Sequence, residues 1–358
     1  MVSGWLSQVT PAPRPIWREL LAHDPSATTY QTPEWLDSLC RVDGWEDVSR
    51  LYTTRSGQQL VLPIVRRSHW ASRLAIEESL PSYWGMGGLV AAEPVDDQAL
   101  ADVWGDILTR PTARIRVRES NLERGAPNVL KPAHRFGVTT YTEHIIDLRG
   151  GFERVWKERF KGSTRTGVRK AEQAGVVIES DSSGRLVPVF YDLYLRWVQR
   201  RAQEAGHPVA LQLYRTRRRE PFRKFAVIAE MLGNSCQVWV AWKKGQPLAA
   251  AVGLTHKSHA IYFRGYSDKA VAGPSCANDL LQRSMIEDAC VRGCIDYSMG
   301  GSGEVPGLIA FKTRFGAVPK GFPVYTLESE AMRRFESWGD GLQQGLRHVL
   351  SSVFRTRA

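Results

Sequence analysis

A lysine and two phenylalanines in the stretch GLIAFKTRFGA, residues 307–317, have types and spacing that could support catalysis. Lys312 follows Phe311 directly, and Phe315 comes four positions after Phe311, so a helix would pack the two rings together. A fixed ammonium can stabilise the oxyanion that forms when a carbonyl carbon becomes tetrahedral. On this pattern alone, however, Lys312 is more simply interpreted as a solvent-facing helix charge beside a packed aromatic pair.

Several familiar kinds of catalytic site have no motif in the chain. There is no HExxH, GxSxG or CxxC sequence, so zinc hydrolases, serine hydrolases and dithiol redox centres are not favoured. The five cysteines are odd in number and indicate a reducing compartment. Cys290 and Cys294 lack partners at zinc spacing and are interpreted as core residues. We therefore expect no metal site.

Charge is the most informative feature of the composition. The 358 residues carry a formal net charge of +11, and Lys and Arg strongly exceed Asp and Glu between Arg154 and Lys224. Such a region attracts a polyanion, but it does not separate tRNA from a nucleotide diphosphate, coenzyme A or an acidic lipid surface. The first residues do not resemble a secretory signal, and no run of about 18 apolar residues occurs. We expect a cytoplasmic protein of two domains.

The two halves of the chain share a pattern of strands. The runs VSRLYTT and LVLPIVRR are joined by RSGQQ, and about 188 residues later CQVWVAW and LAAAVGLTH are joined by KKGQP. A Gly-containing turn between two strand-like runs predicts a hairpin in each half. In the second half a strand HAIYFRGYS, a helix ANDLLQRSMIEDACVRG and a strand CIDYSM follow. The sequence therefore predicts a duplicated α/β unit with mixed sheets.

The predicted domain boundaries follow from this repeat. We expect an N-terminal domain over residues 1–150, a C-terminal domain over 151–327 and a peripheral helical tail over 328–358. Helices are predicted through FERVWKERF, through TRTGVRKAEQAG and from Leu186 to Ala205. Aromatic and basic residues alternate from Pro188 to Lys224, which is also typical of a solvated helix face.

Three stretches together resemble the Fem-type peptidoglycan-bridge aminoacyltransferases. They are YQTPEWLDSL at residues 30–39, the basic helix KGSTRTGVRKAEQAGVVIE, and the segment from YFRGYSDKAVAGPSCANDLL through DYSMGG to GLIAFKTRFGA. The fold that this resemblance implies is a tandem pair of acetyltransferase-like (GNAT) domains, in agreement with the repeated hairpin. Function does not follow from that fold, because such domains serve both acetyl-CoA and aminoacyl-tRNA donors.

The resemblance implies an enzyme that transfers an amino acid from aminoacyl-tRNA to an amine and forms an amide. The implied partners are tRNA and an acceptor that is a cell-wall precursor or a natural-product intermediate; aminoacyl-tRNA is the co-substrate and no cofactor is needed. In the family a Phe-Lys pair after the last strand serves the reacting centre, and Phe311 and Lys312 stand at the matching positions. We therefore expect Lys312 to stabilise the oxyanion or the tRNA acceptor end, and Phe311 to hold it.

Two further groups of residues are expected to bind substrate. Arg165, Arg169 and Lys170 lie on the basic helix and are candidates for tRNA or acceptor phosphates, or else for ordinary helix-surface charge. Tyr262 and Arg264 alternate along IYFRGY, so both would point to one side of a strand and could face a cleft. Packing in the sheet is the other interpretation of the tyrosine.

Two acidic residues complete the predicted site. Asp296 begins the segment DYSMGG and is a candidate acceptor of a hydrogen bond from the attacking amine, or else a turn carboxylate that caps its own backbone. Glu304 lies in the loop GGSGEVPG, which directly precedes the Phe-Lys pair and is a possible lid.

Two other functions stay open at this point. The first is an acyl-CoA-dependent N-acyltransferase with acetyl-CoA as donor. The loop expected to hold its pyrophosphate, SDKAVAGPSCAND, contains only Gly273, followed by Pro274, which has no N–H to donate. The second is a catalytically silent module whose basic face binds nucleic acid or an anionic surface. The sequence does not identify the amino acid, the acceptor or the oligomeric state.

Overall fold

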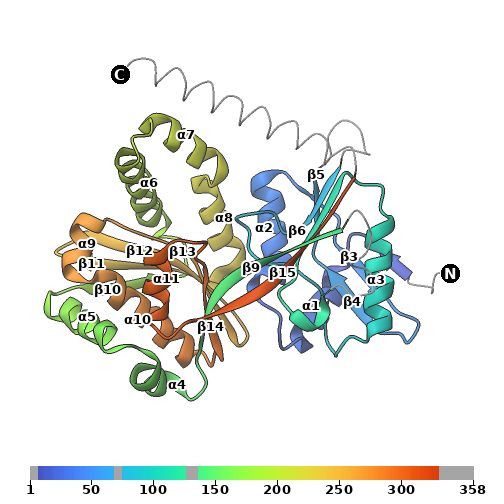
Figure 1. Cartoon of the computed structure of the whole chain (residues 1–358), viewed down its shortest axis with the longest axis horizontal. Coiled ribbons are helices and arrows are strands. Elements are labelled where there is room, and N and C mark those ends of the chain that lie inside the picture. The colour runs from blue at the N-terminus through green and yellow to red at the C-terminus, as the bar shows by residue number, and fades with distance from the viewer. Residues whose placement is uncertain (1–6, 68–74, 126–135, 330–358) are drawn as a thin grey trace.

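The computed structural model describes residues 7–67, 75–125 and 136–329 and shows a mixed α/β fold (Figure 1). The smaller of its two sheets has the order β1 (Ser7–Val9), β3 (Arg50–Thr53), β4 (Gln59–Leu62), β7 (Val90–Ala91). The larger has the order β10 (Val177–Asp181), β11 (Cys236–Lys243), β12 (Gln246–His256), β13 (His259–Ser267), β14 (Asp296–Gly301), β9 (Phe136–Asp147), β15 (Val318–Glu328), β8 (Arg114–Arg118), β6 (Ile76–Ser79), β5 (Val65–Arg67), β2 (Glu46–Asp47).

Helices cover these sheets and connect their strands. In the first half they are α1 (Arg14–His23), η1 (Thr29–Gln31), α2 (Pro33–Asp43), α3 (Asp97–Thr109) and η3 (Leu122–Arg124). In the second half they are α4 (Gly151–Arg154), the π-helical η5 (Val155–Arg159), α5 (Gly162–Gln173), α6 (Val187–Glu204), α7 (Val209–Arg219), α8 (Phe222–Leu232), η6 (Gly233–Ser235), α9 (Lys269–Ser275), α10 (Ala277–Val291) and α11 (Pro306–Thr313). In the described parts of the chain, none of these helices is both long and apolar enough to cross a membrane.

The duplicated α/β unit is confirmed by the strand pairing. Hairpins β3–β4 and β11–β12 each turn on a glycine with positive φ, +83° at Gly57 and +75° at Gly245. In each half a helix then crosses between two parallel strands, α3 from β6 to β8 and α10 from β13 to β14. A parallel pair needs such a crossover, because a tight turn can only join antiparallel strands. The two halves therefore share the order of hairpin and parallel crossover, although the first hairpin lies in the smaller sheet and β6 and β8 in the larger one.

One sheet runs through both predicted domains. Strand β15 of the second half pairs with β8 of the first half and with β9. The boundaries predicted at residues 150 and 327 are therefore not marked by a break in the sheet and stay predictions. Of the predicted tail, residues 330–358 lie outside the described part of the chain.

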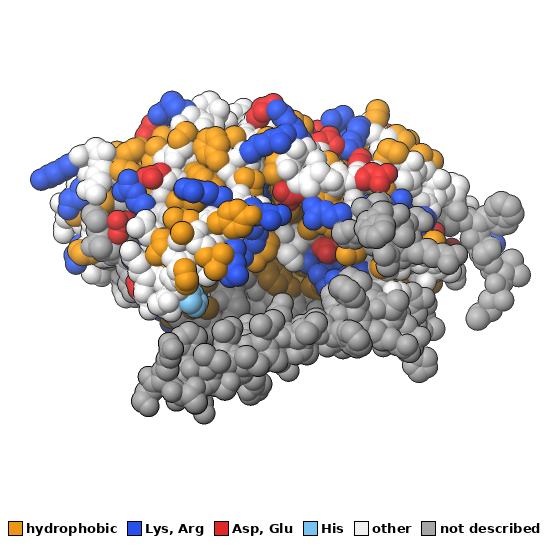
Figure 2. Space-filling view, turned by 90° about the horizontal axis from the view of Figure 1, so that it is seen from above, with side chains coloured by type: hydrophobic (Ala, Val, Ile, Leu, Met, Phe, Trp, Pro, Cys, Tyr) orange, Lys and Arg blue, Asp and Glu red, His pale blue; other side chains and the backbone are white. Residues whose placement is uncertain are grey.

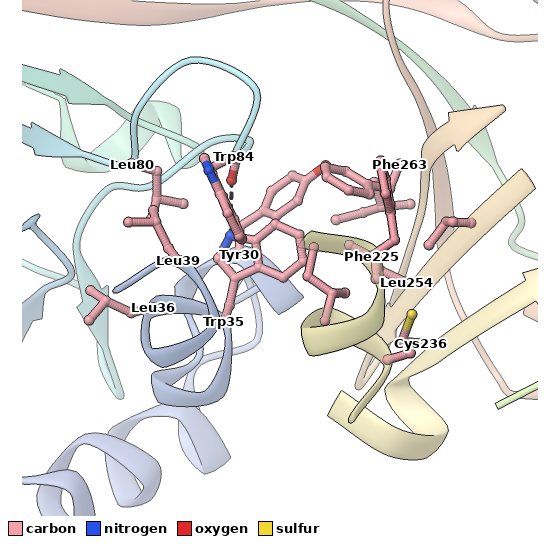
Figure 3. Close-up of a cluster of buried hydrophobic side chains, with 14 of the residues drawn as sticks. Tyr30, Trp35, Leu36, Leu39, Leu80, Trp84, Phe225, Cys236, Leu254 and Phe263 are labelled. Carbon is pink, nitrogen blue, oxygen red and sulfur yellow. Dashed lines mark hydrogen bonds between the residues drawn. The ribbon is translucent and has the colours of Figure 1, made fainter. Parts of the chain in front are cut away.

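A shared hydrophobic core joins the two halves of the chain. Helix α2 begins after Thr32, whose side chain accepts the backbone N–H of Trp35, and it buries Trp35 completely. The Trp35 ring lies 5.5 Å from that of Trp84 and 5.2 Å from that of Phe263 on β13, between centroids (Figure 3). Edge-to-face rings of this kind fix the position of β13 against the first half of the chain.

Polar contacts link the same two halves at the end of α1. Lys257 donates from Nζ to the carbonyl oxygens of Leu21, Ala22 and Asp24. Nearby, the Nδ1 of His259 lies 2.9 Å from Asp296 and its Nε2 lies 2.8 Å from the carbonyl oxygen of Pro25. Since both partners of His259 are acceptors, only the protonated imidazolium satisfies both contacts.

The contacts of His259 lead us to expect that stability depends on pH. Burial alone would lower the pKa of His259, but Asp296 and the Pro25 carbonyl outweigh it and raise the pKa above its usual 6.5. The stabilisation is therefore complete below pH 6.5 and is lost as pH rises through the raised value. We expect the free energy of unfolding to fall by about 1–3 kcal/mol over that range. Urea titrations at a series of pH values should show this fall in the native chain, whereas an unchanged fall in His259→Gln would contradict the assignment.

Candidate functional site

A cleft of about 1090 Å³ opens where strands β13 and β14 stop pairing. The two strands pair only from His259–Ile261 to Asp296–Ser298. Beyond this point residues 262–266 of β13 and 299–301 of β14 line the cleft, together with α11 and first-half residues such as Tyr30 and Met86. Shortened pairing between two parallel strands therefore creates the space in which a substrate can reach the backbone.

Lys312 is a buried cation that lines this cleft, so its interpretation as a solvent-facing charge is wrong. Its side chain is 2% exposed, and Nζ donates to the carbonyl oxygens of Gly300 and Gly301, both at 2.7 Å. Burial lowers the pKa of Lys312 to about 8, against the opposing effect of the Glu143 carboxylate. The ammonium is thus held in one place by the end of β14. Phe311 does not line the cleft; its ring packs 5.2 Å from that of Phe315, between centroids.

Two glycines let tyrosine hydroxyls approach the backbone of the cleft. A Cβ built on Gly301 would lie 2.4 Å from the Tyr141 hydroxyl, and one on Gly265 would lie 1.8 Å from the Tyr262 hydroxyl. Any larger residue at either position would displace a tyrosine from the cleft wall. Burial raises the pKa of Tyr262 to about 12, so this hydroxyl stays protonated at neutral pH.

A buried carboxylate with two cations forms another part of the cleft region. Glu220 is 2% exposed and accepts hydrogen bonds from Lys224 at 3.1 Å, Arg264 at 3.0 Å and the Tyr194 hydroxyl at 3.0 Å. Lys224 and Arg264 also donate to the carbonyl oxygen of Tyr83, at 2.8 and 3.1 Å. We refer to Glu220, Lys224 and Arg264 as the charge cluster. It holds the first-half loop at Tyr83 against the second half.

The predicted site residues are thus only partly brought together. Lys312, Tyr262 and Arg264 line the same cleft. Glu304 is exposed in the turn before α11 and does not line it. Asp296 lies at the start of β14, beside His259, and lines a second cavity of about 550 Å³. Asp296 has this position because the register of β13 and β14 pairs it with His259.

The predicted basic helix lies elsewhere. Arg165 and Arg169 on α5 line a separate surface hollow with Phe152 and Trp156, and Arg165 donates to the Trp156 carbonyl oxygen at 3.2 Å. Lys170 is exposed on the same helix. Helix α5 packs on α10, on the face of β11–β12 opposite to α6 (Figure 1). These three residues do not share the cleft with Lys312.

Sequence reasoning missed the two carboxylates nearest the buried cations. Glu143 and Glu220 both line the cleft. Glu220 precedes Lys224 by four residues, which is a usable signal of pairing, although Glu220 lies in the connection between α7 and α8. Glu143 stands in the polar run TTYTEH, which gives no sign that this part of β9 faces a cavity.

The start of α10 does not offer an open anion site. Asp279 lies in its first turn, is 4% exposed, and accepts a hydrogen bond at 3.0 Å from Arg314. Gly167 of α5 packs so closely that a Cβ there would lie 2.1 Å from an oxygen of Asp279. A carboxylate with its own arginine thus occupies the helix end at which a phosphate group would be stabilised.

Comparisons with known proteins agree with this architecture. Residues 158–313 match the model of the family described as Acetyltransferase (GNAT) domain. The crystal structure of FemX aligns with 12% identity and a TM-score of 0.63 over 88% of this chain and 96% of that one. L-PGS from Bacillus licheniformis aligns with 12% identity and a TM-score of 0.51, over 90% and 93%.

A protein of unknown function from Bacteroides thetaiotaomicron aligns with 11% identity and a TM-score of 0.58, over 90% of this chain and all of that one. Among curated proteins no sequence matches. At these identities the alignments establish the fold. The chain therefore has the tandem GNAT-like fold of the Fem-type proteins that its sequence resembles.

Proposed function

We propose that this protein is an acyltransferase that moves an amino acid from aminoacyl-tRNA to an amine and forms an amide. The observation that supports it most is the buried Lys312 ammonium, fixed in the cleft by two backbone carbonyls. In the reaction the amine attacks the ester carbonyl carbon, the C–O bond to the ribose breaks, and the ribose hydroxyl leaves. A preorganised cation beside the carbonyl oxygen stabilises the charge that develops there.

The charge of the cleft favours an anionic donor. Five cations line it against three carboxylates: Arg116, Arg118, Arg219, Arg264 and Lys312 against Glu143, Glu220 and Glu328. Coenzyme A is also anionic, but Asp279 at the start of α10 opposes a pyrophosphate there. For these reasons we favour the tRNA ester over acetyl-CoA. The acceptor is proposed to be a cell-wall precursor or a natural-product intermediate.

Helix α7 offers a surface for the tRNA backbone. Its last turn carries Arg217, Arg218 and Arg219, and only Thr216 of the helix is buried. Tyr214 is 57% exposed on the same helix. Basic and hydrophobic side chains are interspersed on the face seen in Figure 2, which includes α7. Exposed arginines beside an aromatic ring suit phosphates and unpaired bases.

Charge reversal on α7 should weaken tRNA binding without changing the chemistry. We expect Arg217→Glu with Arg218→Glu to raise the KM for aminoacyl-tRNA about tenfold and to make the dependence on salt shallower, because phosphate contacts release counterions. Steady-state kinetics at several salt concentrations measure both effects. The matched control is Arg169→Glu with Lys170→Glu on α5, an equal change of charge at exposed residues away from the cleft; equal effects of the two pairs would contradict a specific role for α7.

The donor is identified by a direct experiment. The protein is incubated with an amine-containing extract and either radiolabelled aminoacyl-tRNAs or radiolabelled acetyl-CoA. Label that moves from tRNA to an RNase-resistant small product supports the proposal. Label that moves only from acetyl-CoA establishes the acyl-CoA-dependent alternative, and salt-sensitive RNA binding with no transfer from either donor establishes a binding module.

A further inference from the structure

Glu143 lies where the two cavities meet. Three residues line both the cleft of Lys312 and the second cavity, namely Tyr30, Met86 and Glu143, and only Glu143 of these is an acid. It is opposite Gly301 on β14 on one side and Lys320 on β15 on the other. A carboxylate at this junction can therefore be reached from either cavity.

A chain of hydrogen bonds connects Glu143 to the lysine. Ser298 donates from Oγ to Oε2 of Glu143 at 2.6 Å, and the backbone N–H of Gly300 donates to the same Oγ at 3.1 Å. The Gly300 carbonyl oxygen in turn accepts from Lys312 at 2.7 Å. Among the described residues, this bond from Ser298 to Oε2 is the hydrogen bond that the Glu143 side chain makes. One oxygen of the carboxylate is thus fixed and the other is left for a ligand.

The two cavities differ in charge. The cleft has an excess of cations, whereas the second cavity is lined by four acids and three bases: Glu93, Glu123, Glu143 and Asp296 against Arg124, His259 and Lys320. Two of these bases already form ion pairs: Arg124 pairs with Asp24, and His259 pairs with Asp296. The second cavity therefore suits a cation, and the cleft suits an anion.

We propose that the acceptor enters through the second cavity as a primary ammonium and that Glu143 is the general base that makes it nucleophilic. The proposal rests on the acyl-transfer function proposed above. Glu143 takes a proton from the ammonium, and the nitrogen lone pair then attacks the ester carbonyl carbon that the cleft presents beside Lys312. The nitrogen loses its second excess proton to the solvent as the tetrahedral species collapses to the amide; the ester C–O bond breaks, and Glu143 passes the proton that it took from the ammonium to the leaving ribose oxygen.

The surroundings of Glu143 are consistent with this role. Burial raises the pKa of Glu143 above the usual glutamate value, and the Ser298 hydrogen bond and the Lys312 charge oppose that rise. The other titratable groups that face it are Asp296 on β14, whose charge raises the pKa further, and the hydroxyls of Tyr30 and Tyr141. A carboxylate with a raised pKa takes a proton from an ammonium more effectively than a fully solvated one does.

The proposal is tested by comparing two nucleophiles in the full-length protein. Transfer is measured to n-butylamine, which is protonated at pH 7, and to hydroxylamine, which is largely neutral at that pH and needs no base. We expect Glu143→Gln to reduce the enzyme-dependent rate with n-butylamine by about 100-fold or more, and that with hydroxylamine by less than about threefold. Equal losses with both nucleophiles overturn the proposal. Thermal melting of the variant shows that it is folded.

A control variant and the use of both donors test the role of Glu143 independently of which donor the protein uses. Glu93→Gln removes an acid from the same cavity away from the junction, and we expect it to raise the KM for n-butylamine while kcat is kept. Both nucleophiles are tested with aminoacyl-tRNA and with acetyl-CoA. If native protein uses only acetyl-CoA, the proposed donor is wrong but the ratio between the nucleophiles still decides the role of Glu143. If native protein transfers from neither donor to either nucleophile, the base assignment is wrong as well.

Discussion

Replacement of Lys312 by alanine is expected to lower kcat about 100- to 1000-fold, with little change in the KM for the donor. This is the effect of removing one preorganised partner of a developing oxyanion. The lysine contacts Gly300 and Gly301 rather than a residue of the tRNA-binding surface proposed on α7, so the loss should appear in the chemical step. Single-turnover transfer of radiolabelled amino acid measures that step directly.

The charge of Lys312 also predicts how activity depends on pH. Because burial brings the pKa of Lys312 to about 8, its positive charge is present below that pH and is lost as pH rises through it. The native enzyme should therefore lose kcat/KM above about pH 8. The residual activity of Lys312→Ala should show no fall at that pH. If the fall persists in the variant, another group is responsible for it.

A matched control separates catalysis from folding. Lys257 also donates to several backbone carbonyls, but at the end of α1, and it lines neither the cleft nor the second cavity. We expect Lys257→Ala to lower the free energy of unfolding and to leave kcat within about twofold of the native value. A comparable loss of kcat in both variants, or full activity of a folded Lys312→Ala, would contradict the role of Lys312.

The sequence predicted those parts of the fold that depend on local backbone conformation. The turns at Gly57 and Gly245 need a positive φ, which makes a glycine between two strand-like runs a readable signal in both halves. Lys312 is different, because its burial depends on where β14 ends and where the carbonyls of Gly300 and Gly301 point. The local pattern AFKTRF contains none of that information, and only the family resemblance drew attention to it.

Sheet register and helix packing determine the positions of the predicted site residues that lie outside the cleft. Asp296 lies beside His259 because β13 and β14 pair at those two residues, and a one-residue shift would have turned the carboxylate to the other face. The arginines of α5 lie away from the cleft because α5 packs against α10. Neither relation is fixed by the composition of a single segment.

The largest expected change in stability comes from the charge cluster. We expect Glu220→Gln to lower the free energy of unfolding by about 3–5 kcal/mol, because the buried ammonium of Lys224 and the half-buried guanidinium of Arg264 lose their shared carboxylate. Lys224 is 0% exposed, and its ammonium lies 4.5 Å from the ring centre of Trp84. Its Nζ donates to Glu220 and to the Tyr83 carbonyl oxygen. Urea titration of the native protein and the variant measures the difference.

A second substitution shows whether the loss of stability in Glu220→Gln comes from unpaired cations. If repulsion and desolvation of two unpaired cations cause it, removal of one cation in Glu220→Gln with Lys224→Met should restore about 1–3 kcal/mol, although the Tyr83 carbonyl loses one of its two donors. Burial already lowers the pKa of Lys224 to about 8, so its charge is costly even beside Glu220. If the double variant is no more stable than Glu220→Gln alone, the glutamate acts through its hydrogen bond with Tyr194 and the position of α8, and the electrostatic explanation is wrong.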